Sequence, residues 1–204
     1  MKALLLIDIQ NDFCPGGALA VPQGDQIIPV VNRLISHFDC VVTTQDWHTA
    51  NHSSFASSHD GKSEYETVKM EYGEQVLWPD HCIQGTSGAD FHPDLSTGKA
   101  QLVIRKGFRK TIDSYSAFFE NDKRTATGLN GYLQERGVQD LYVSGLATDF
   151  CVKWSVLDGV RLNYSLFVIE DAVRGIDLNG SVEQAWAEMT GSGARRIHSD
   201  SITG

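Results

Sequence analysis

The sequence predicts an α/β fold, a three-layer α/β/α sandwich around a central, mainly parallel sheet of six strands. Two observations lead to this prediction: short runs of apolar residues recur along the chain, and segments with helical patterns lie between them. A parallel sheet that helices cover on both sides needs strands that are apolar on both faces, and strands that alternate with helices build such a sandwich. The six runs are residues 3–9, 39–44, 101–104, 140–144, 165–169 and, more weakly, 194–198.

Apolar residues at helical spacing mark the helices between these strands. The segment 28–38 has this spacing, and its Pro29 falls in the first turn, where proline is tolerated. A second pattern stops before Gly137, which suits the end of a helix. A third repeats valine every four residues over the segment 152–160. Ser181, which precedes two acidic or amide residues and an apolar pair, predicts the capped start of a last helix.

One long segment, residues 45–99, breaks this alternation. It shows little periodicity and holds many His, Ser, Asp, Gly and Trp residues. So long a stretch without regular structure in a compact domain is more often functional than idle. No repeat, low-complexity tract or linker divides the chain, so we expect residues 1–204 to form a single domain. In that domain we expect 45–99 to form the loop region that carries the functional site, because ligands of such folds lie beyond the carboxyl ends of the strands.

Charge and composition exclude several classes of protein. The formal net charge is −9, and no concentrated basic surface is evident, so we expect no nucleic-acid partner. The first apolar run stops at Asp8, too early for a signal peptide or a membrane span. The four cysteines lie far apart, without the paired spacing of a zinc finger or a redox motif. We therefore expect a cytoplasmic protein with reduced thiols and no membrane partner.

Cys151 is the candidate nucleophile. It lies where the fourth predicted strand gives way to a helix. A sulfur there is close to the positive end of the helix backbone dipoles, which favours the thiolate. The same turn presents free backbone N–H groups, which can form an oxyanion hole. On position alone, a thiol packed in the core is an equally good interpretation.

Asp8 and Lys106 stand at the ends of two other predicted strands. Each is a charged residue that follows an apolar run, and the carboxyl ends of parallel strands meet at one edge of a sheet. With Cys151, they would bring a carboxylate, an ammonium and a thiol together. That set suits nucleophilic attack on an amide, with the carboxylate moving protons and the ammonium stabilising negative charge. Taken singly, Asp8 or Lys106 could equally form a salt bridge at the rim.

Asp46, His48 and His81 form a candidate metal site. Asp46 and His48 follow the second predicted strand, and their side chains can face one point if the backbone stays extended. A carboxylate and two imidazoles suit zinc, iron or manganese and leave positions open for water or substrate. The Asp-x-His pair alone is a weak signal, because histidines are common in surface loops. His52 and His59 lie nearby without a necessary role as ligands.

The whole chain resembles the nicotinamidase/pyrazinamidase family of the isochorismatase-like hydrolase superfamily, which has a Rossmann-like topology. The matching motifs occur in family order and cover nearly all of the first 160 residues, whereas the last 40 match less distinctively. These motifs are Asp8 to Cys14, Gly16 to Val21, Gln45 to His48, Trp78 to Cys82, Lys106-Gly107, Asp113 to Phe118 and Gly145 to Cys151.

The resemblance implies a role for each matching position. Cys151 resembles the nucleophile, Asp8 the general base and later acid, and Lys106 the third member of the triad. The backbone N–H groups of Ala147 and Cys151 resemble the oxyanion hole, next to a cis peptide between Leu146 and Ala147. The metal ligands would be Asp46, His48 and His81, and the walls of the pocket around a flat pyridine ring would be Phe13, Trp78 and Tyr115.

The implied reaction is hydrolysis of nicotinamide to nicotinate and ammonia, a step of NAD salvage, through a cysteine thioester. Pyrazinamide is the expected second substrate. The resemblance implies one divalent metal ion as cofactor, zinc first, with iron or manganese as alternatives. A fourth ligand such as His52, and the choice between a monomer and a homodimer, stay open. The alternatives are another amidohydrolase of the superfamily, such as a carbamoyl amidohydrolase, an isochorismatase, and a non-catalytic metal or nucleotide binder.

Overall fold

The computed structural model describes residues 1–203 and contains one six-stranded sheet. Its strand order is β5-β2-β1-β6-β7-β8, and each pair of neighbours is parallel. The prediction of a mainly parallel sheet of six strands is therefore confirmed. The strands are β1 (Lys2–Ile7), β2 (Cys40–Asp46), β5 (Leu102–Lys106), β6 (Asp140–Leu146), β7 (Ser165–Arg174) and β8 (Arg195–Ile197).

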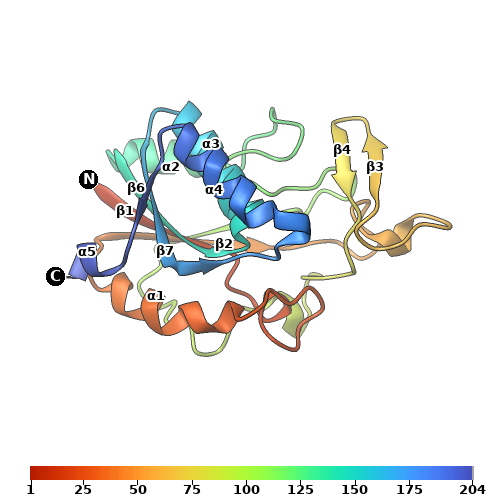
Figure 1. Cartoon of the computed structure of the whole chain (residues 1–204), viewed down its shortest axis with the longest axis horizontal. Helices are drawn as coiled ribbons and strands as arrows, with labels where there is room; N and C mark the ends of the chain where they lie inside the picture. Colours follow the sequence, from red (N-terminus) through yellow and green to blue (C-terminus); the bar gives the residue numbers. More distant parts are fainter. Residues whose placement is uncertain (204) are drawn as a thin grey trace.

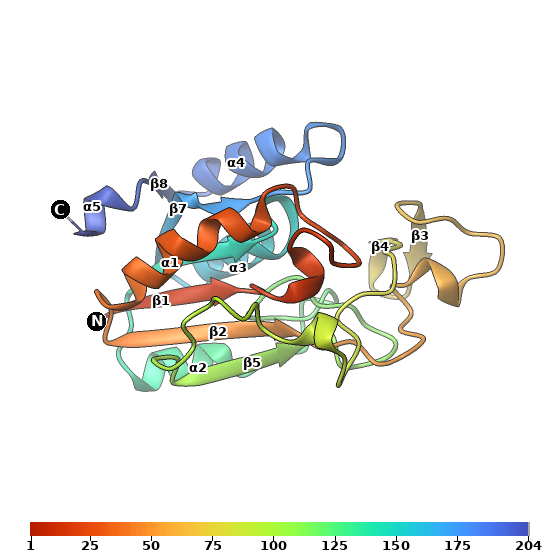
Figure 2. The same ribbon diagram turned by 90° about the horizontal axis from the view of Figure 1, so that it is seen from below.

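Helices cover both faces of the sheet, which makes the predicted three layers (Figures 1 and 2). One face carries α2 (Leu129–Glu135), α3 (Lys153–Arg161) and α4 (Ser181–Gly191), and the other carries α1 (Ile28–Ile35) and α5 (Asp200–Thr203). No helix within residues 1–203 combines the length and the apolar character that a bilayer-spanning segment needs.

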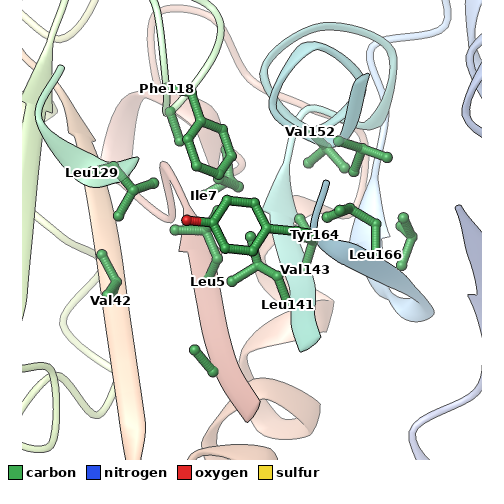
Figure 3. Close-up of a cluster of buried hydrophobic side chains, with 14 of the residues drawn as sticks. Leu5, Ile7, Val42, Phe118, Leu129, Leu141, Val143, Val152, Tyr164 and Leu166 are labelled. Atoms are coloured by element: carbon green, nitrogen blue, oxygen red, sulfur yellow. The ribbon is translucent and has the colours of Figure 1, made fainter. Parts of the chain in front are cut away.

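The central strand β1 explains why its sequence is apolar without a break. Leu5 and Ile7 pack into the apolar cluster beneath α2 and α3. Figure 3 shows Leu129 and Val152, two further members of this cluster, above the sheet. The intervening leucines, Leu4 and Leu6, belong to the opposite cluster with the apolar side of α1. Since successive side chains of a strand point to opposite faces, both faces bury apolar groups from Ala3 to Ile7, and only Lys2 at the start of the strand is polar and exposed.

Two local predictions were wrong. Ser181 does not cap α4 with its side chain: it is the first residue of the helix, and its Oγ lies 2.5 Å from Asp149 Oδ2. Within 45–99, an antiparallel hairpin of β3 (Thr67–Met70) and β4 (Gly73–Val76) breaks the expected irregularity. Of its eight strand residues only Gln75 is buried, so these short strands lack the buried apolar run that marks the strands of the main sheet. The hairpin projects beyond the carboxyl ends of the sheet (Figure 2).

Gly145→Ala is expected to lower the free energy of unfolding by more than about 2 kcal/mol, because backbone strain and a steric clash coincide. Gly145 has φ of 120°, and a Cβ there would lie 2.1 Å from the carbonyl oxygen of Ile7 on β1. The matched control is Gly131→Ala in α2, where a Cβ meets no atom within 4 Å. That change should stabilise the helix by about 0.5–1 kcal/mol. Urea denaturation measures both, and equal midpoints for the two variants would contradict the prediction.

Candidate active site

The ends of four strands bring the candidate residues to one edge of the sheet. Asp46 and Lys106 are the last residues of β2 and β5, and Asp8 directly follows β1. Cys151 lies in a π-helical turn, Thr148–Val152, between β6 and α3. Because β5, β2, β1 and β6 are consecutive in the sheet, their carboxyl ends converge.

The ammonium of Lys106 lies at the centre of this group. Its Nζ is 2.8 Å from Asp8 Oδ2, 3.2 Å from Asp46 Oδ1 and 3.5 Å from Cys151 Sγ. It also donates a hydrogen bond to the carbonyl oxygen of Ser114, at 2.9 Å. Lys106 is only 1% exposed, so it meets these partners without competition from bulk water. The structure thus brings the sulfur, the carboxyl and the amine together as the sequence predicts.

Two carboxylates share this ammonium, and their pKa values move in opposite directions. Burial would raise the pKa of Asp46, but Lys106 and His48 outweigh it and hold that pKa well below its ordinary value. Burial raises the pKa of Asp8, which Lys106 offsets only in part. Burial disfavours the charged form of Lys106, yet Asp46 and Asp8 raise its pKa well above the ordinary value. Asp46 and Lys106 therefore stay charged, and Asp8 is the carboxyl that can take up a proton.

The surroundings of the Cys151 sulfur favour the neutral thiol, in contrast to the bias toward the thiolate that its place before a helix predicts. Burial raises the pKa of this thiol well above its ordinary value, and the nearby Lys106 lowers it by less. The position before α3 does not overcome the loss of solvent around the sulfur. The nucleophile therefore needs a neighbouring base to remove its proton, and Asp8 is the group with that capacity.

Polar neighbours that the sequence did not single out hold the two carboxylates. The Thr44 hydroxyl donates to Asp8 Oδ1 at 2.6 Å and accepts the Asp8 N–H at 3.1 Å. The Gln10 side chain binds the backbone of Asp46 at both ends, through Asp46 O at 2.8 Å and Asp46 N at 2.7 Å. Asp8 has φ of 47°, so these contacts secure a left-handed backbone position. A threonine within an apolar strand was the only available signal.

Asp46, His48 and His81 can hold a metal ion. Asp46 Oδ2 lies 3.3 Å from His81 Nε2 and 3.7 Å from His48 Nδ1. His48 Nδ1 is buried without a hydrogen-bond partner among the described residues, and His81 Nδ1 is engaged by the carbonyl oxygen of Pro79 at 2.8 Å. One carboxylate oxygen and two imidazole nitrogens therefore face the same point, and this donor set fits a divalent metal.

The charges of the two histidines suit a cation at this point. Burial lowers the pKa of His48 well below its ordinary value, so its ring is neutral, the form that binds metals. Burial would also lower the pKa of His81, but the hydrogen bond and charge of Asp46 raise it. A bound metal ion would replace the proton that Asp46 and His81 otherwise share.

Protein groups engage both ring nitrogens of His52 in this arrangement. His48, His52 and Asp113 also lie close enough to share an ion. However, His52 Nε2 donates to the carbonyl oxygen of Arg109 at 2.8 Å, and its Nδ1 accepts from Ser54 Oγ at 2.8 Å. Both ring nitrogens are then engaged, and no lone pair is left for a metal.

An aromatic pocket opens onto the sulfur and the metal ligands. It has about 330 Å³ of free space, solvent at its mouth included. Phe13, Trp78 and Tyr115, the predicted walls, all line it. Trp78 meets Phe150 edge to face, with ring centroids 4.7 Å apart. Phe150 and two aliphatic walls, Leu19 and Ile176, were missed because apolar residues in loops and turns look like ordinary core residues.

The turn between β6 and α3 supplies backbone N–H groups at the floor of this pocket. The Leu146–Ala147 peptide is cis, as the resemblance implies. Among residues 1–203, no group accepts a hydrogen bond from the Ala147 N–H, and both Ala147 and Cys151 line the pocket. A free donor next to a nucleophile is what a developing oxyanion requires.

The fold and this site define the class of the protein. Residues 2–201 match the isochorismatase domain family, and the chain belongs to that family. The nicotinamidase of Acinetobacter baylyi is 54% identical over 200 residues, 98% of this chain and 94% of the relative. A solved nicotinamidase/pyrazinamidase of Acinetobacter baumanii has a TM-score of 0.97 and 58% identity, covering 98% of this chain and 97% of that one. The pyrazinamidase of Pyrococcus horikoshii, solved in complex with zinc, has a TM-score of 0.78 and 35% identity, covering 97% and 98%.

Proposed function

We propose that the chain is a nicotinamidase, which hydrolyses the carboxamide of nicotinamide to nicotinate and ammonia and also accepts pyrazinamide. The convergence of Asp8 and Lys106 on Cys151, which lines an aromatic pocket, carries this proposal. The pocket suits a flat ring, and the triad suits attack on an amide attached to it. The identity of 54% to a curated nicotinamidase supports the same substrate.

Asp8 moves every proton in the reaction that we propose. It takes the thiol proton while the sulfur attacks the carboxamide carbon, and the backbone N–H groups of Ala147 and Cys151 stabilise the oxyanion. Asp8 then returns that proton to the departing nitrogen, so that the C–N bond breaks, ammonia leaves and a thioester remains. Asp8 next takes a proton from water, whose oxygen attacks the thioester. The C–S bond then breaks, and the same proton returns to sulfur.

The remaining residues of the site bind and orient the substrate and the metal ion. Lys106 compensates the negative charge that appears on Asp8 and on the oxyanion, and Phe13, Trp78 and Tyr115 enclose the ring. Asp46, His48 and His81 would hold one divalent metal ion, which supplies a Lewis-acid contact for the pyridine nitrogen and so fixes the ring. We propose zinc for this ion, which the zinc complex of the Pyrococcus pyrazinamidase supports, with iron and manganese as alternatives.

Two wider features belong to the proposal. Segment 45–99 acts as the metal- and substrate-binding loop region of a single domain, because it contributes His48, Trp78 and His81 to the site. The protein works in the cytoplasm, which the four free cysteines favour since a reducing compartment keeps thiols unpaired.

An ammonia assay before and after metal chelation tests this function. We expect ammonia from nicotinamide, a loss of most activity on chelation, and recovery on addition of zinc, iron or manganese, because the metal orients the ring. An N-carbamoyl amino acid is the control substrate and should release none. Ammonia from the carbamoyl compound but not from nicotinamide would favour another amidohydrolase of the family. Unchanged kinetics after proven metal removal would exclude the metal from the reaction.

A further inference from the structure

Gln75 is a buried polar side chain in a hairpin that is otherwise exposed or half-exposed. It lies on β4 and is 1% exposed, and no other residue of segment 67–76 is buried. A primary amide offers two donor hydrogens and an acceptor oxygen. Its Nε2 lies within hydrogen-bond distance of Val76 O (2.7 Å), Tyr115 Oη (2.8 Å) and Asp113 Oδ2 (2.9 Å), and its Oε1 accepts from Tyr72 Oη (3.0 Å) and Asn121 Nδ2 (3.2 Å).

One branch of this network reaches the metal site. Asp113 Oδ1 lies 3.2 Å from His48 Nε2 and accepts the Ser114 N–H at 2.8 Å. When His48 donates its Nε2–H to Asp113, its Nδ1 carries the lone pair, and Nδ1 is the nitrogen that faces Asp46. A carboxylate behind a ligand histidine fixes the tautomer and the ring orientation, and it affects metal affinity strongly. Gln75 in turn fixes that carboxylate through its other oxygen.

The second branch reaches the wall of the ring pocket. Tyr115 Oη accepts hydrogen bonds from Gln75 Nε2 and, at 3.0 Å, from Trp78 Nε1. Tyr115 and Trp78 both line the pocket, and their ring planes are almost perpendicular at 83°. A buried hydroxyl or indole N–H that loses its partner is costly, so these bonds restrict both rings to one orientation.

We propose that Gln75 is a positioning residue that sets the distance and orientation of the metal ligand His48 relative to the aromatic wall of the ring pocket. The hairpin β3–β4 is then a working part of the site, because its Gln75 amide binds both Asp113 and Tyr115. A pyridine ring must contact the metal and the aromatic wall together. Loss of the hydrogen bonds in either branch therefore weakens substrate binding. The link to nicotinamide rests on the proposed function, whereas the link to the metal does not.

Gln75→Met tests the proposal, because methionine has a similar size and cannot form these hydrogen bonds. Release of bound zinc to a chromophoric chelator is expected to be at least about tenfold faster than in the unaltered protein. KM for nicotinamide should rise several-fold, while kcat at saturating zinc and substrate should change much less. The control is Glu74→Met on the same strand, whose side chain is exposed, and it should leave all three quantities unchanged.

A double variant tests the route of the effect. In an Asp113→Ala background, Gln75→Met should accelerate zinc release little further, because the first substitution has already broken the branch to His48. A folded Gln75→Met protein with a normal zinc release rate and a normal KM would overturn the proposal. The same holds if only the thermal stability of that protein is lower. If Gln75→Met does not fold, Tyr72→Phe removes one bond to Oε1, and unaltered zinc release and KM in that variant would likewise overturn it. Zinc release remains informative even if nicotinamide proves not to be the substrate.

Discussion

Cys151→Ala is expected to abolish ammonia release while nicotinamide still binds. The substitution removes the only sulfur that lines the pocket, 3.5 Å from Lys106 Nζ, and leaves the aromatic walls and the metal ligands in place. A covalent route has no substitute for the nucleophile, so kcat should fall by at least about 10⁴-fold, as when other catalytic nucleophiles are removed. Steady-state ammonia release measures the loss, and calorimetric titration with nicotinamide measures the retained binding.

Cys40→Ala is the matched control for loss of a buried thiol. Cys40 is fully buried on β2, within the apolar cluster and away from the pocket. Its replacement should cost stability, about 1 kcal/mol, and leave kcat near that of the unaltered protein. Appreciable turnover by a Cys151→Ala protein that keeps its fold and its metal would rule out the thioester.

Asp8→Asn is expected to lower kcat by about 10²–10⁴-fold, the usual contribution of general acid–base catalysis. Because burial raises the pKa of the Cys151 thiol, the sulfur is protonated at neutral pH and requires a base. An asparagine matches the shape of Asp8 and keeps an oxygen for the Thr44 hydroxyl, yet it cannot accept a proton. Asp60→Asn, at an exposed position, is the control for loss of one carboxylate and should leave kcat unchanged.

The pH profile gives an independent check on Asp8. The ionised carboxylate is the active form, so kcat/KM should fall as the pH drops through the pKa of Asp8. Burial raises that pKa above the ordinary 3.8, and the acid limb should therefore lie above the range of an exposed aspartate. In Asp8→Asn this limb should disappear. An acid limb that stays unchanged in the variant would assign the titration to another group and remove Asp8 as the base.

Much of the fold could be predicted because its main signal is local. Residues 3–7 are apolar on both faces, as a strand covered on both sides requires, and they form most of the central strand β1. The site followed from one rule of topology: charged residues that end parallel strands meet at the carboxyl edge. Asp8, Asp46 and Lys106 meet for this reason, although up to 98 positions separate them in the chain.

The sequence by itself thus determined the layers, the six strands of the main sheet and the residues that gather at one edge of it. Only the tertiary structure showed the surroundings of those groups: burial raises the pKa of the Cys151 thiol, Lys106 holds the pKa of Asp46 low while that of Asp8 is raised, and both ring nitrogens of His52 are engaged. It also revealed Gln75, a polar residue that no pattern marked. The physical reason is that periodicity reports which side of an element is buried, whereas ionisation and hydrogen bonding depend on every group packed around an atom, and those groups come from distant parts of the chain.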